Sequence, residues 1–406
     1  MSLDDAIWWH VYPLGAVGAP IHDAGRDAPV NRLARLEEWL DYAVELGCSG
    51  LLLGPVFAST SHGYDTVDHF RIDPRLGDDA AFDHLITQAR KRGLRVLLDG
   101  VFNHVGVAHP LVAAALADGH GLVRLEQVDG RLQPMPWEGH GDLVLLDHSR
   151  PEVADLVTEV MLHWLRRGIA GWRLDVAYAV PSTFWREVID RVRAEFGEAV
   201  FLGEVIHGDY VRLAAEGHLD TVTQYELWKA IWSSLADRNL WELDWALARH
   251  AEFCAAFLPN TFIGNHDVDR IASTLGPDGA ALAAAILFTL PGMPSIYYGD
   301  EQGFTGAKGS GLHADDPLRP PLPDGPDELA PDGWWLYRLY QQLIGLRRRH
   351  PWLATGQVSV LAKDNDWIEY RVTGSGQQLD VRIGLEPRGA FRVRVEGGES
   401  LSWPRD

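Results

Sequence analysis

Ile169-Ala-Gly-Trp-Arg-Leu-Asp-Val-Ala177 is the stretch of sequence that decides the fold. It is short and mostly apolar and follows a helical pattern that ends at Gly168, so it predicts a buried β-strand. Alternate side chains of a strand face the same way, which places Arg173 and Asp175 on one face. A guanidinium beside a carboxylate lowers the pKa of that carboxylate and keeps it ionised, as a nucleophile or an electrostatic stabiliser requires. Taken alone, the pair is equally consistent with a structural ion pair.

The same unit recurs along the chain: a helical pattern, a glycine that ends it, an apolar strand, and a polar residue where the strand ends. Helices are predicted over residues 32–46, 79–92, 151–167 and 184–196. Strands are predicted over residues 7–12, 50–54, 94–99, 169–175, 199–204, 219–224, 261–264 and around 288–298. Apolar strands alternating with helices indicate a parallel sheet, and eight of them favour a closed (β/α)8 TIM barrel. A doubly wound open sheet is the alternative, which the lack of a Gly-x-Gly-x-x-Gly motif after the first strand disfavours.

Two segments depart from this repeat. Residues 104–147 contain scattered His, Gly and Pro and are too long for an ordinary βα loop, so they predict a lid or a small inserted subdomain after the third strand. After residue 356 the apolar pattern changes to period two, which predicts a small antiparallel β domain. We therefore expect a barrel over residues 1–103 and 148–350, an inserted segment over 104–147 and a C-terminal β domain over 351–406.

Charge and composition narrow the class of partner. The chain has 36 basic and 57 acidic residues and a formal net charge of −21, which argues against nucleic acid or an anionic membrane. Cys48 and Cys254 lie among apolar neighbours and are expected to be free thiols. The N-terminal Met-Ser-Leu-Asp-Asp lacks the pattern of a signal peptide, and there is no run of about 18 apolar residues. We expect a cytoplasmic protein without a membrane segment, with a trimmed export signal as the alternative.

Four segments place polar side chains at predicted strand ends. They are Asp99-Gly-Val-Phe-Asn-His104, Gly171-Trp-Arg-Leu-Asp175, Gly203-Glu204 and Phe262-Ile-Gly-Asn-His-Asp267. The C-terminal ends of barrel strands open onto one mouth, so Asp175, Glu204 and Asp267 can meet there. Three carboxylates in one pocket do not all stay ionised cheaply, so at least one should have a raised pKa. A site with both ionised and protonated carboxyl groups suits glycosidic cleavage, in which a carboxylate attacks and a protonated carboxyl group donates its proton to the leaving oxygen.

In order and spacing, these four segments resemble the four conserved regions of the α-amylase family, glycoside hydrolase family 13. Gly63-Tyr-Asp-Thr-Val-Asp68 and Leu290-Pro-Gly-Met-Pro-Ser-Ile-Tyr-Tyr-Gly-Asp-Glu301 are similar to two further segments of the family. Within it, Gly171-Trp-Arg-Leu-Asp-Val-Ala177 most resembles the neopullulanase, cyclomaltodextrinase and α-glucosidase branches. Tyr178-Ala179 stands where many α-amylases have Lys-His that binds glucose on the reducing side, so the exact glucan stays open.

The resemblance implies a retaining mechanism with three acidic residues. Asp175 would be the nucleophile, Glu204 the general acid and then base, and Asp267 the acid that grips sugar hydroxyls. Arg173 would hold Asp175 ionised. In a retaining enzyme the nucleophile and the acid lie about 5–5.5 Å apart. Further residues would line or shape the sugar site: Tyr64, Asp65, Asp99, His104 and His266.

The expected activity is retaining hydrolysis of α-1,4-glucosidic bonds in malto-oligosaccharides or related short α-glucans, with no required cofactor. Asn103 matches a position that binds structural calcium in many relatives, so structural Ca²⁺ is an open alternative, although the inserted segment has no obvious Asp cluster. A transglycosidase or isomerase of the same family, such as a trehalose-synthase-like enzyme, would use the same acids. A non-catalytic carbohydrate-binding or interaction barrel is the remote alternative, which the three intact acids disfavour. The partner is therefore a small-molecule glucan, and the sequence does not indicate the oligomeric state.

Overall fold

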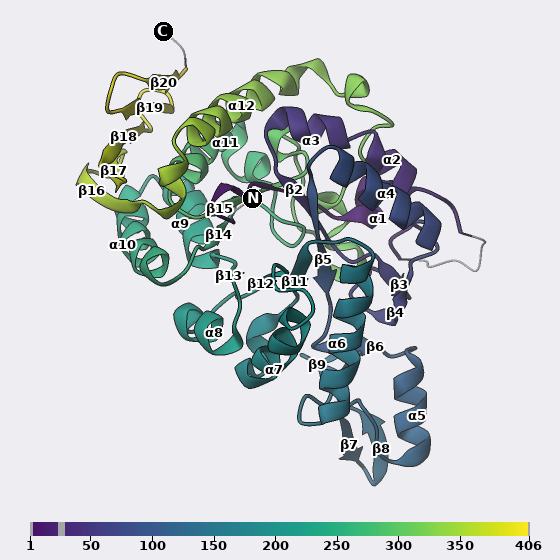
Figure 1. Cartoon of the computed structure of the whole chain (residues 1–406). Helices are drawn as coiled ribbons and strands as arrows, with labels where there is room; N and C mark the ends of the chain where they lie inside the picture. The colour runs from purple at the N-terminus through teal and green to yellow at the C-terminus, as the bar shows by residue number, and fades with distance from the viewer. Residues whose placement is uncertain (1–2, 23–28, 405–406) are drawn as a thin grey trace.

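A closed barrel of eight parallel strands forms the body of the computed structural model, which describes residues 3–22 and 29–404 (Figure 1). The strands lie in the order β13-β12-β11-β5-β2-β1-β15-β14, and a parallel bridge between Thr223 and Asn260 closes the ring. The (β/α)8 prediction is confirmed. The barrel strands are β1 (Trp8–Val11), β2 (Gly50–Leu53), β5 (Arg95–Gly100), β11 (Gly171–Leu174), β12 (Val200–Gly203), β13 (Thr221–Val222), β14 (Asn260–Thr261) and β15 (Met293–Tyr297).

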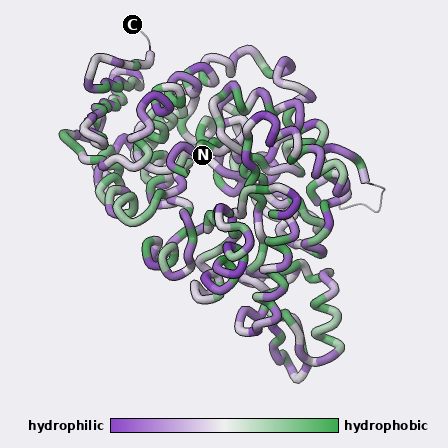
Figure 2. The backbone as a smooth tube through the Cα atoms, viewed as in Figure 1, coloured by the Kyte–Doolittle hydropathy of each residue, from purple (hydrophilic) through white to green (hydrophobic). Residues whose placement is uncertain are grey.

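Helices surround the barrel and carry both hydrophobic and hydrophilic residues, as helices with one face on a sheet do (Figure 2). α6, for example, buries Val153, Val157 and Trp164 against the barrel. The α-helices are α1 (Pro13–Ala16), α2 (Leu33–Glu37), α3 (Leu40–Leu46), α4 (Asp79–Lys91), α5 (Pro110–Asp118), α6 (Pro151–Arg166), α7 (Ser182–Arg193), α8 (Tyr210–Gly217), α9 (Tyr225–Ala236), α10 (Leu240–Ala256), α11 (Ile271–Thr289) and α12 (Trp334–Arg349). Short 3₁₀ helices lie at Leu3–Asp5, Ala177–Ala179, Asp300–Gln302, Gly311–His313, Asp316–Leu318, Pro326–Glu328, Pro331–Gly333 and Pro351–Thr355.

Two element boundaries differ from the predictions. The helix predicted over residues 32–46 is two helices, α2 and α3, because the helix is interrupted at Glu38 and Trp39. The indole of Trp39 stacks on Trp9 with ring centroids 6.2 Å apart, and its Nε1 donates to the carbonyl of Pro323 at 3.3 Å. The last strand begins at Met293, because Phe288 belongs to α11.

Successive layers fill the interior of the barrel. The layer nearer the N-terminal ends of the strands is a small apolar cluster that includes Trp8, Leu52, Leu97, Val200, Leu202 and Met293. Fully burying side chains of this size contributes roughly 1.5–3 kcal/mol each. Two residues further along a strand the side chain faces the interior again, one layer nearer the C-terminal end. His10 therefore follows Trp8, Asp99 follows Leu97 and Glu204 follows Leu202, so a polar layer lies directly on the apolar one.

An inserted segment leaves the barrel after β5, and it forms the projection at the bottom of Figure 1. It contains α5 and the short strands β6 (His104–Gly106), β7 (Leu125–Val128), β8 (Arg131–Pro134), β9 (Pro136–Trp137) and β10 (His140–Leu145). Strand β10 pairs antiparallel with β6, and β7 pairs with β8. A separate hairpin of β3 (Phe57–Ser59) and β4 (Thr66–Ile72) precedes it in the chain.

A five-stranded antiparallel sheet follows α12, as predicted from the period-two pattern. Along β18, Leu379, Val381 and Ile383 are buried while their neighbours are more exposed, so one face of the sheet forms the small core. The strands are β16 (Gln357–Lys363), β17 (Trp367–Gly374), β18 (Gln377–Gly384), β19 (Ala390–Val395) and β20 (Ser400–Trp403). We propose the predicted domain boundaries: the barrel over residues 1–103 and 148–350, the insertion over 104–147 and the C-terminal β domain over 351–406.

Helix α11 is long and apolar enough to cross a membrane by length and composition, but 61% of its most apolar stretch is buried inside the protein. Its residues Ala280–Thr289 are buried in the wall of the barrel, which accounts for the composition. Gly276 has φ 68° and ψ 176°, so α11 is kinked near its start. Cys48 and Cys254 are both free thiols, as predicted.

Candidate active site

One guanidinium, that of Arg173, contacts three carboxylates at the mouth of the barrel. Its Nη1 donates to both oxygens of Asp99, at 2.8 and 2.6 Å, and to Oδ1 of Asp175 at 3.1 Å. Its Nη2 lies 2.6 Å from Oε1 of Glu204. All four side chains are buried. The pairing register explains the arrangement, because Arg173 on β11 lies beside Asp99 on β5 and beside Leu202 on β12, two residues before Glu204.

Glu204 is held by two further donors. Oε1 accepts a hydrogen bond from the hydroxyl of Tyr225 at 3.0 Å, and Oε2 accepts one from the backbone N–H of Val176 at 3.1 Å. Val176 has φ 40° and ψ 44°, a left-handed conformation that is costly for a β-branched residue. The strained backbone turns its N–H toward Glu204 directly after Asp175. The strained residue Val176 therefore connects two of the predicted catalytic acids: it follows Asp175 in the chain and donates a hydrogen bond to Glu204.

Asp267 lies at the end of the loop after β14 and is partly exposed. Its Oδ1 accepts a hydrogen bond from Nη2 of Arg319 at 3.1 Å, and its backbone N–H donates to Oδ1 of Asn265 at 2.9 Å. Arg319 also donates through Nε to the carbonyl of His266 at 3.0 Å, and its guanidinium lies 4.5 Å from the ring centroid of Tyr12. The buried Arg319 thus fixes both the side chain of Asp267 and the loop before it.

A stack of rings lies beside the carboxylates. His266 is sandwiched between Tyr64, with centroids 5.4 Å apart, and Tyr12, at 5.8 Å, and both pairs are nearly parallel. The hydroxyl of Tyr64 donates to Asp99 at 3.0 Å and also contacts Nε2 of His266, which lies 3.1 Å from Oδ2 of Asp267. A neutral His266 with its proton on Nε2 satisfies these contacts. The stack links Asp99 to Asp267 across the mouth of the barrel.

Burial dominates the proton affinities of this cluster. It raises the pKa of Asp175 well above its ordinary value, and the attraction of Arg173 only partly opposes that rise. Burial also raises the pKa of Asp99 to about 6, again against Arg173. Arg173 lowers the pKa of Asp175, as predicted, but burial has the larger effect, so the net shift is upward. The prediction that at least one acid has a raised pKa is confirmed.

The same burial keeps the neighbouring imidazoles neutral. It lowers the pKa of His104 to about 4 and that of His266 well below its ordinary value, where the nearby Arg173 lowers it further. Both rings are thus uncharged hydrogen-bonding groups at neutral pH. The formal charge of the site comes from its carboxylates and arginines.

A cavity of about 560 Å³ opens above these groups, a volume typical of small-molecule sites. Its walls include Asp175, Glu204 and Asp267, which the structure thus brings to one cavity as predicted. Tyr64 and His104 also line it. Asp99, Arg173 and His266 lie behind the wall, where they contact the residues that form it.

Asp65, another residue predicted for the sugar site, lies in the hairpin between β3 and β4. It is buried and does not line the cavity; its Oδ2 accepts a hydrogen bond from Ser61 Oγ at 2.9 Å, and its Oδ1 lies 4.0 Å from Nδ1 of His62. Asp65 therefore shapes the loop that presents Tyr64 and His62, which both line the cavity.

Sequence reasoning missed several residues that form the site. Arg319 lies in the irregular segment after β15, and Tyr225 is the first residue of α9, where an aromatic residue reads as core. Trp137 comes from the inserted segment and stacks on His104 with centroids 6.3 Å apart. Trp228 also lines the cavity. No sequence pattern marks Arg319, whereas the length of the insertion was a signal that part of it covers the mouth.

Asn103, the candidate calcium ligand, is buried with Nδ2 3.1 Å from Nδ1 of His104. Among residues 3–22 and 29–404, no group of three His, Cys, Asp or Glu side chains with converging ligand atoms includes a neighbour of Asn103. Calcium requires six to eight oxygen ligands. Structural Ca²⁺ at Asn103 stays a prediction.

Comparisons with known proteins agree with the fold and the motifs. Residues 31–120 and 139–319 match the model of the alpha amylase catalytic domain. A cyclomaltodextrinase from Geobacillus thermopakistaniensis is 29% identical over 98% of this chain and 74% of its own length. A maltogenic alpha-amylase from Bacillus acidopullulyticus is 31% identical over 89% of this chain and 66% of its own length. The solved structure of the cyclic α-maltosyl-(1→6)-maltose hydrolase from Arthrobacter globiformis has a TM-score of 0.83 and 26% identity, covering 98% of this chain and 99% of that chain.

The chain belongs to the α-amylase family of glycoside hydrolases. It spans about two thirds to three quarters of the length of the two enzymes that it matches by sequence.

Proposed function

We propose that the chain is a retaining α-glycosidase that hydrolyses α-1,4-glucosidic bonds in malto-oligosaccharides and related short or cyclic α-glucans. The observation that supports this best is the convergence of Asp175, Glu204 and Asp267 on one cavity, with the first two joined through Arg173. Three acids in one cavity provide both a nucleophile and a proton donor, as glycosidic cleavage requires.

In the first step, the carboxylate of Asp175 attacks the anomeric carbon while the glycosidic bond breaks. Glu204 gives its proton to the departing oxygen, and a covalent glycosyl ester forms on Asp175. The cluster retains a proton because one guanidinium faces three buried carboxylates, and we propose that in the reactive complex this proton is on Glu204 while Asp175, paired with Arg173, is ionised. Two hydrogen bonds to Glu204, from Tyr225 and Val176, would keep its carboxyl group oriented toward the cavity.

In the second step, Glu204 accepts a proton from a water molecule, and the resulting hydroxyl attacks the anomeric carbon from the side that the leaving group vacated. The ester bond to Asp175 breaks, and the configuration is retained after two inversions. Asp267 would hold sugar hydroxyls, supported by Arg319. Protein carboxylates and water supply every proton and bond, so we propose that no cofactor takes part.

The substrate class rests on the relatives and on the cavity. The matched enzymes are named for cyclic maltodextrins, maltose release and a cyclic maltosyl-maltose. The cavity has aromatic rings on its wall, at Tyr64, Trp137, Tyr178 and Trp228, and such rings pack well on the apolar faces of sugars. A short glucan fits this mixture of rings and carboxylates, whereas a charged polymer does not.

The test is product analysis of maltotriose, γ-cyclodextrin, soluble starch and sucrose, incubated separately with the wild type, Glu204→Gln and Asp175→Asn. By NMR, we expect the sugars that the wild type releases to have the α configuration when they first form. We expect kcat of both variants to fall at least about 10²-fold. Glu226→Gln is the matched control, because Glu226 pairs with Arg249 outside the cavity, and it should keep wild-type activity.

The alternatives give different products. Longer or rearranged glucosides in place of free sugars would indicate a transglycosidase that uses the same acids. First-formed sugars of β configuration would contradict the retaining mechanism. If the wild type changes none of the substrates, the hydrolase proposal fails, and a binding role becomes the better explanation.

A further inference from the structure

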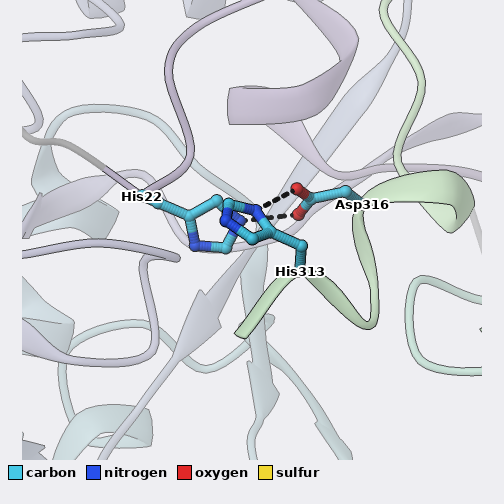
Figure 3. A group of neighbouring side chains, drawn as sticks. All are labelled: His22, His313 and Asp316. Carbon is cyan, nitrogen blue, oxygen red and sulfur yellow. Dashed lines mark hydrogen bonds and ion pairs between the residues drawn. The ribbon is translucent and has the colours of Figure 1, made fainter. Parts of the chain in front are cut away.

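Three side chains converge at the rim of the cavity, apart from the acids described above. His22 comes from the segment after α1, and His313 and Asp316 come from the loop after β15 (Figure 3). Nε2 of His22 lies 2.7 Å from Oδ1 of Asp316, and Nδ1 of His313 lies 2.8 Å from Oδ2 of the same carboxylate. The two imidazole rings are edge to face with centroids 4.2 Å apart. One ligand atom from each residue lies within 4.8 Å of the others.

The chemistry of this donor set is that of a transition-metal site. Two imidazole nitrogens and one carboxylate oxygen are ligands that Zn²⁺ accepts, with a water molecule in the fourth position. Both oxygens of the Asp316 carboxylate face an imidazole nitrogen, so the three side chains point their ligand atoms toward one another. The net charge of −21 also favours the approach of a cation.

The position of the cluster connects it to the mouth of the barrel. His22 and Asp316 line the rim of the same cavity as Asp175 and Glu204, while His313 lies outside it. Asp316 begins a 3₁₀ turn that ends at Leu318, and the next residue is Arg319, which holds Asp267. An ion bound here would bridge two segments that are about 290 residues apart in the sequence and fix the turn that precedes Arg319.

We propose that His22, His313 and Asp316 bind one divalent transition-metal ion of the Zn²⁺ type, and that the bound ion clamps the rim of the cavity and restricts access to it. Binding replaces the two imidazole–carboxylate hydrogen bonds by three bonds to the ion. The proton that each contacting nitrogen donates to Asp316 moves to the other ring nitrogen or is released to water, so each neutral imidazole carries its proton on the nitrogen that faces away from the metal. The site is distinct from the carboxylate cluster at Arg173, since it shares no residue with that cluster.

The test is calorimetric titration of the full chain with ZnCl₂, alongside thermal unfolding with and without the ion. We expect one tight zinc ion per chain and a rise in Tm for the wild type. His313→Ala should lower zinc affinity at least about tenfold and abolish the rise in Tm. His218→Ala is the matched control, because His218 forms a single exposed pair with Asp190 at 2.6 Å and has no second imidazole in that pair. It should bind zinc as the wild type does.

The clamp is tested by activity, a readout that rests on the proposed function. Zinc at saturation should reduce the turnover of a glucan by the wild type, EDTA should restore it, and His313→Ala should resist the loss. Equal zinc binding by the wild type and His313→Ala would overturn the metal site. Zinc binding that leaves turnover unchanged would overturn the clamp. If the wild type has no glycosidase activity, the calorimetry and the Tm shift still decide whether the metal binds.

Discussion

Replacing Tyr225 with phenylalanine removes one buried hydroxyl beside the predicted general acid. That hydroxyl donates to Oε1 of Glu204 at 3.0 Å and accepts a hydrogen bond from Nδ2 of Asn265 at 2.8 Å. The phenyl ring keeps the edge-on contact with Phe262, whose centroid is 4.9 Å away. The substitution therefore tests hydrogen bonds and leaves the packing unchanged.

The size of the effect follows from the two partners. Asn265 is buried and would keep an unpaired N–H, which costs about 1–3 kcal/mol of unfolding free energy. Glu204 lines the cavity, where water can replace part of the lost bond. A hydrogen bond to a charged group contributes about 1.5–3 kcal/mol, and each 1.36 kcal/mol of barrier is tenfold in rate. We expect kcat/KM to fall about 10- to 100-fold.

The assay is steady-state kinetics on the best glucan, together with denaturant unfolding. Tyr340→Phe is the control, since Tyr340 is fully buried and its hydroxyl has no hydrogen-bond partner within the described part of the chain. Its removal should leave kcat/KM unchanged and stability equal or slightly higher. The reasoning is refuted if Tyr225→Phe keeps the wild-type kcat/KM, or if both variants lose activity equally.

Three further predictions test the site and the barrel. Burial raises the pKa of Asp99 from 3.8 to about 6, so its contribution to stability is present below about pH 4 and is lost as the pH rises through 6. As the pH rises from 4 to 7, the wild type should therefore lose up to about 3 kcal/mol of unfolding free energy that Asp99→Asn does not lose. Equal pH profiles of the two proteins would contradict this. Arg319→Gln should lower kcat/KM about tenfold, because the third acid loses its buried partner, and unchanged kinetics would show that Arg319 is only structural. Gly171→Ala would place a Cβ 2.1 Å from a carbonyl oxygen of β12, so we expect a loss of soluble protein or at least about 3 kcal/mol of stability, whereas Gly384→Ala, which meets no atom within 4 Å, should fold normally.

The barrel could be predicted because its strands are buried on both sides and its helices have one apolar face. The run ending at Asp99 shows this, since residues 94–98 are apolar except for Arg95 and follow a helix that ends before Gly93. The pattern fails where burial is complete. The second half of α11, residues 280–289, is buried and almost wholly apolar, so periodicity does not separate the end of the helix at Thr289 from the strand that begins at Met293.

The site was predictable where the motif lies at a strand end and unpredictable where a loop supplies the residue. Asp175 and Glu204 follow their strands directly, and the barrel geometry brings them together. Arg319 reaches the cavity from a segment without regular structure, so its place depends on packing that no local pattern encodes. The upward shift in the pKa of Asp175 was also beyond the sequence, because it depends on how deeply the cluster is buried.

The alternation of layers inside the barrel restricts how this protein can change during evolution. Insertion of a single residue before Leu97 on β5 would turn Asp99 outward to the helices and bring an apolar neighbour into the cavity. Deletion of a residue from β11 would do the same to Arg173. Insertions and deletions should therefore accumulate between the strands, as in residues 104–147, while the number of residues in each strand stays constant. A lineage can thus exchange the loops that border its cavity and still keep the alternation of side chains along the strands that hold its acids.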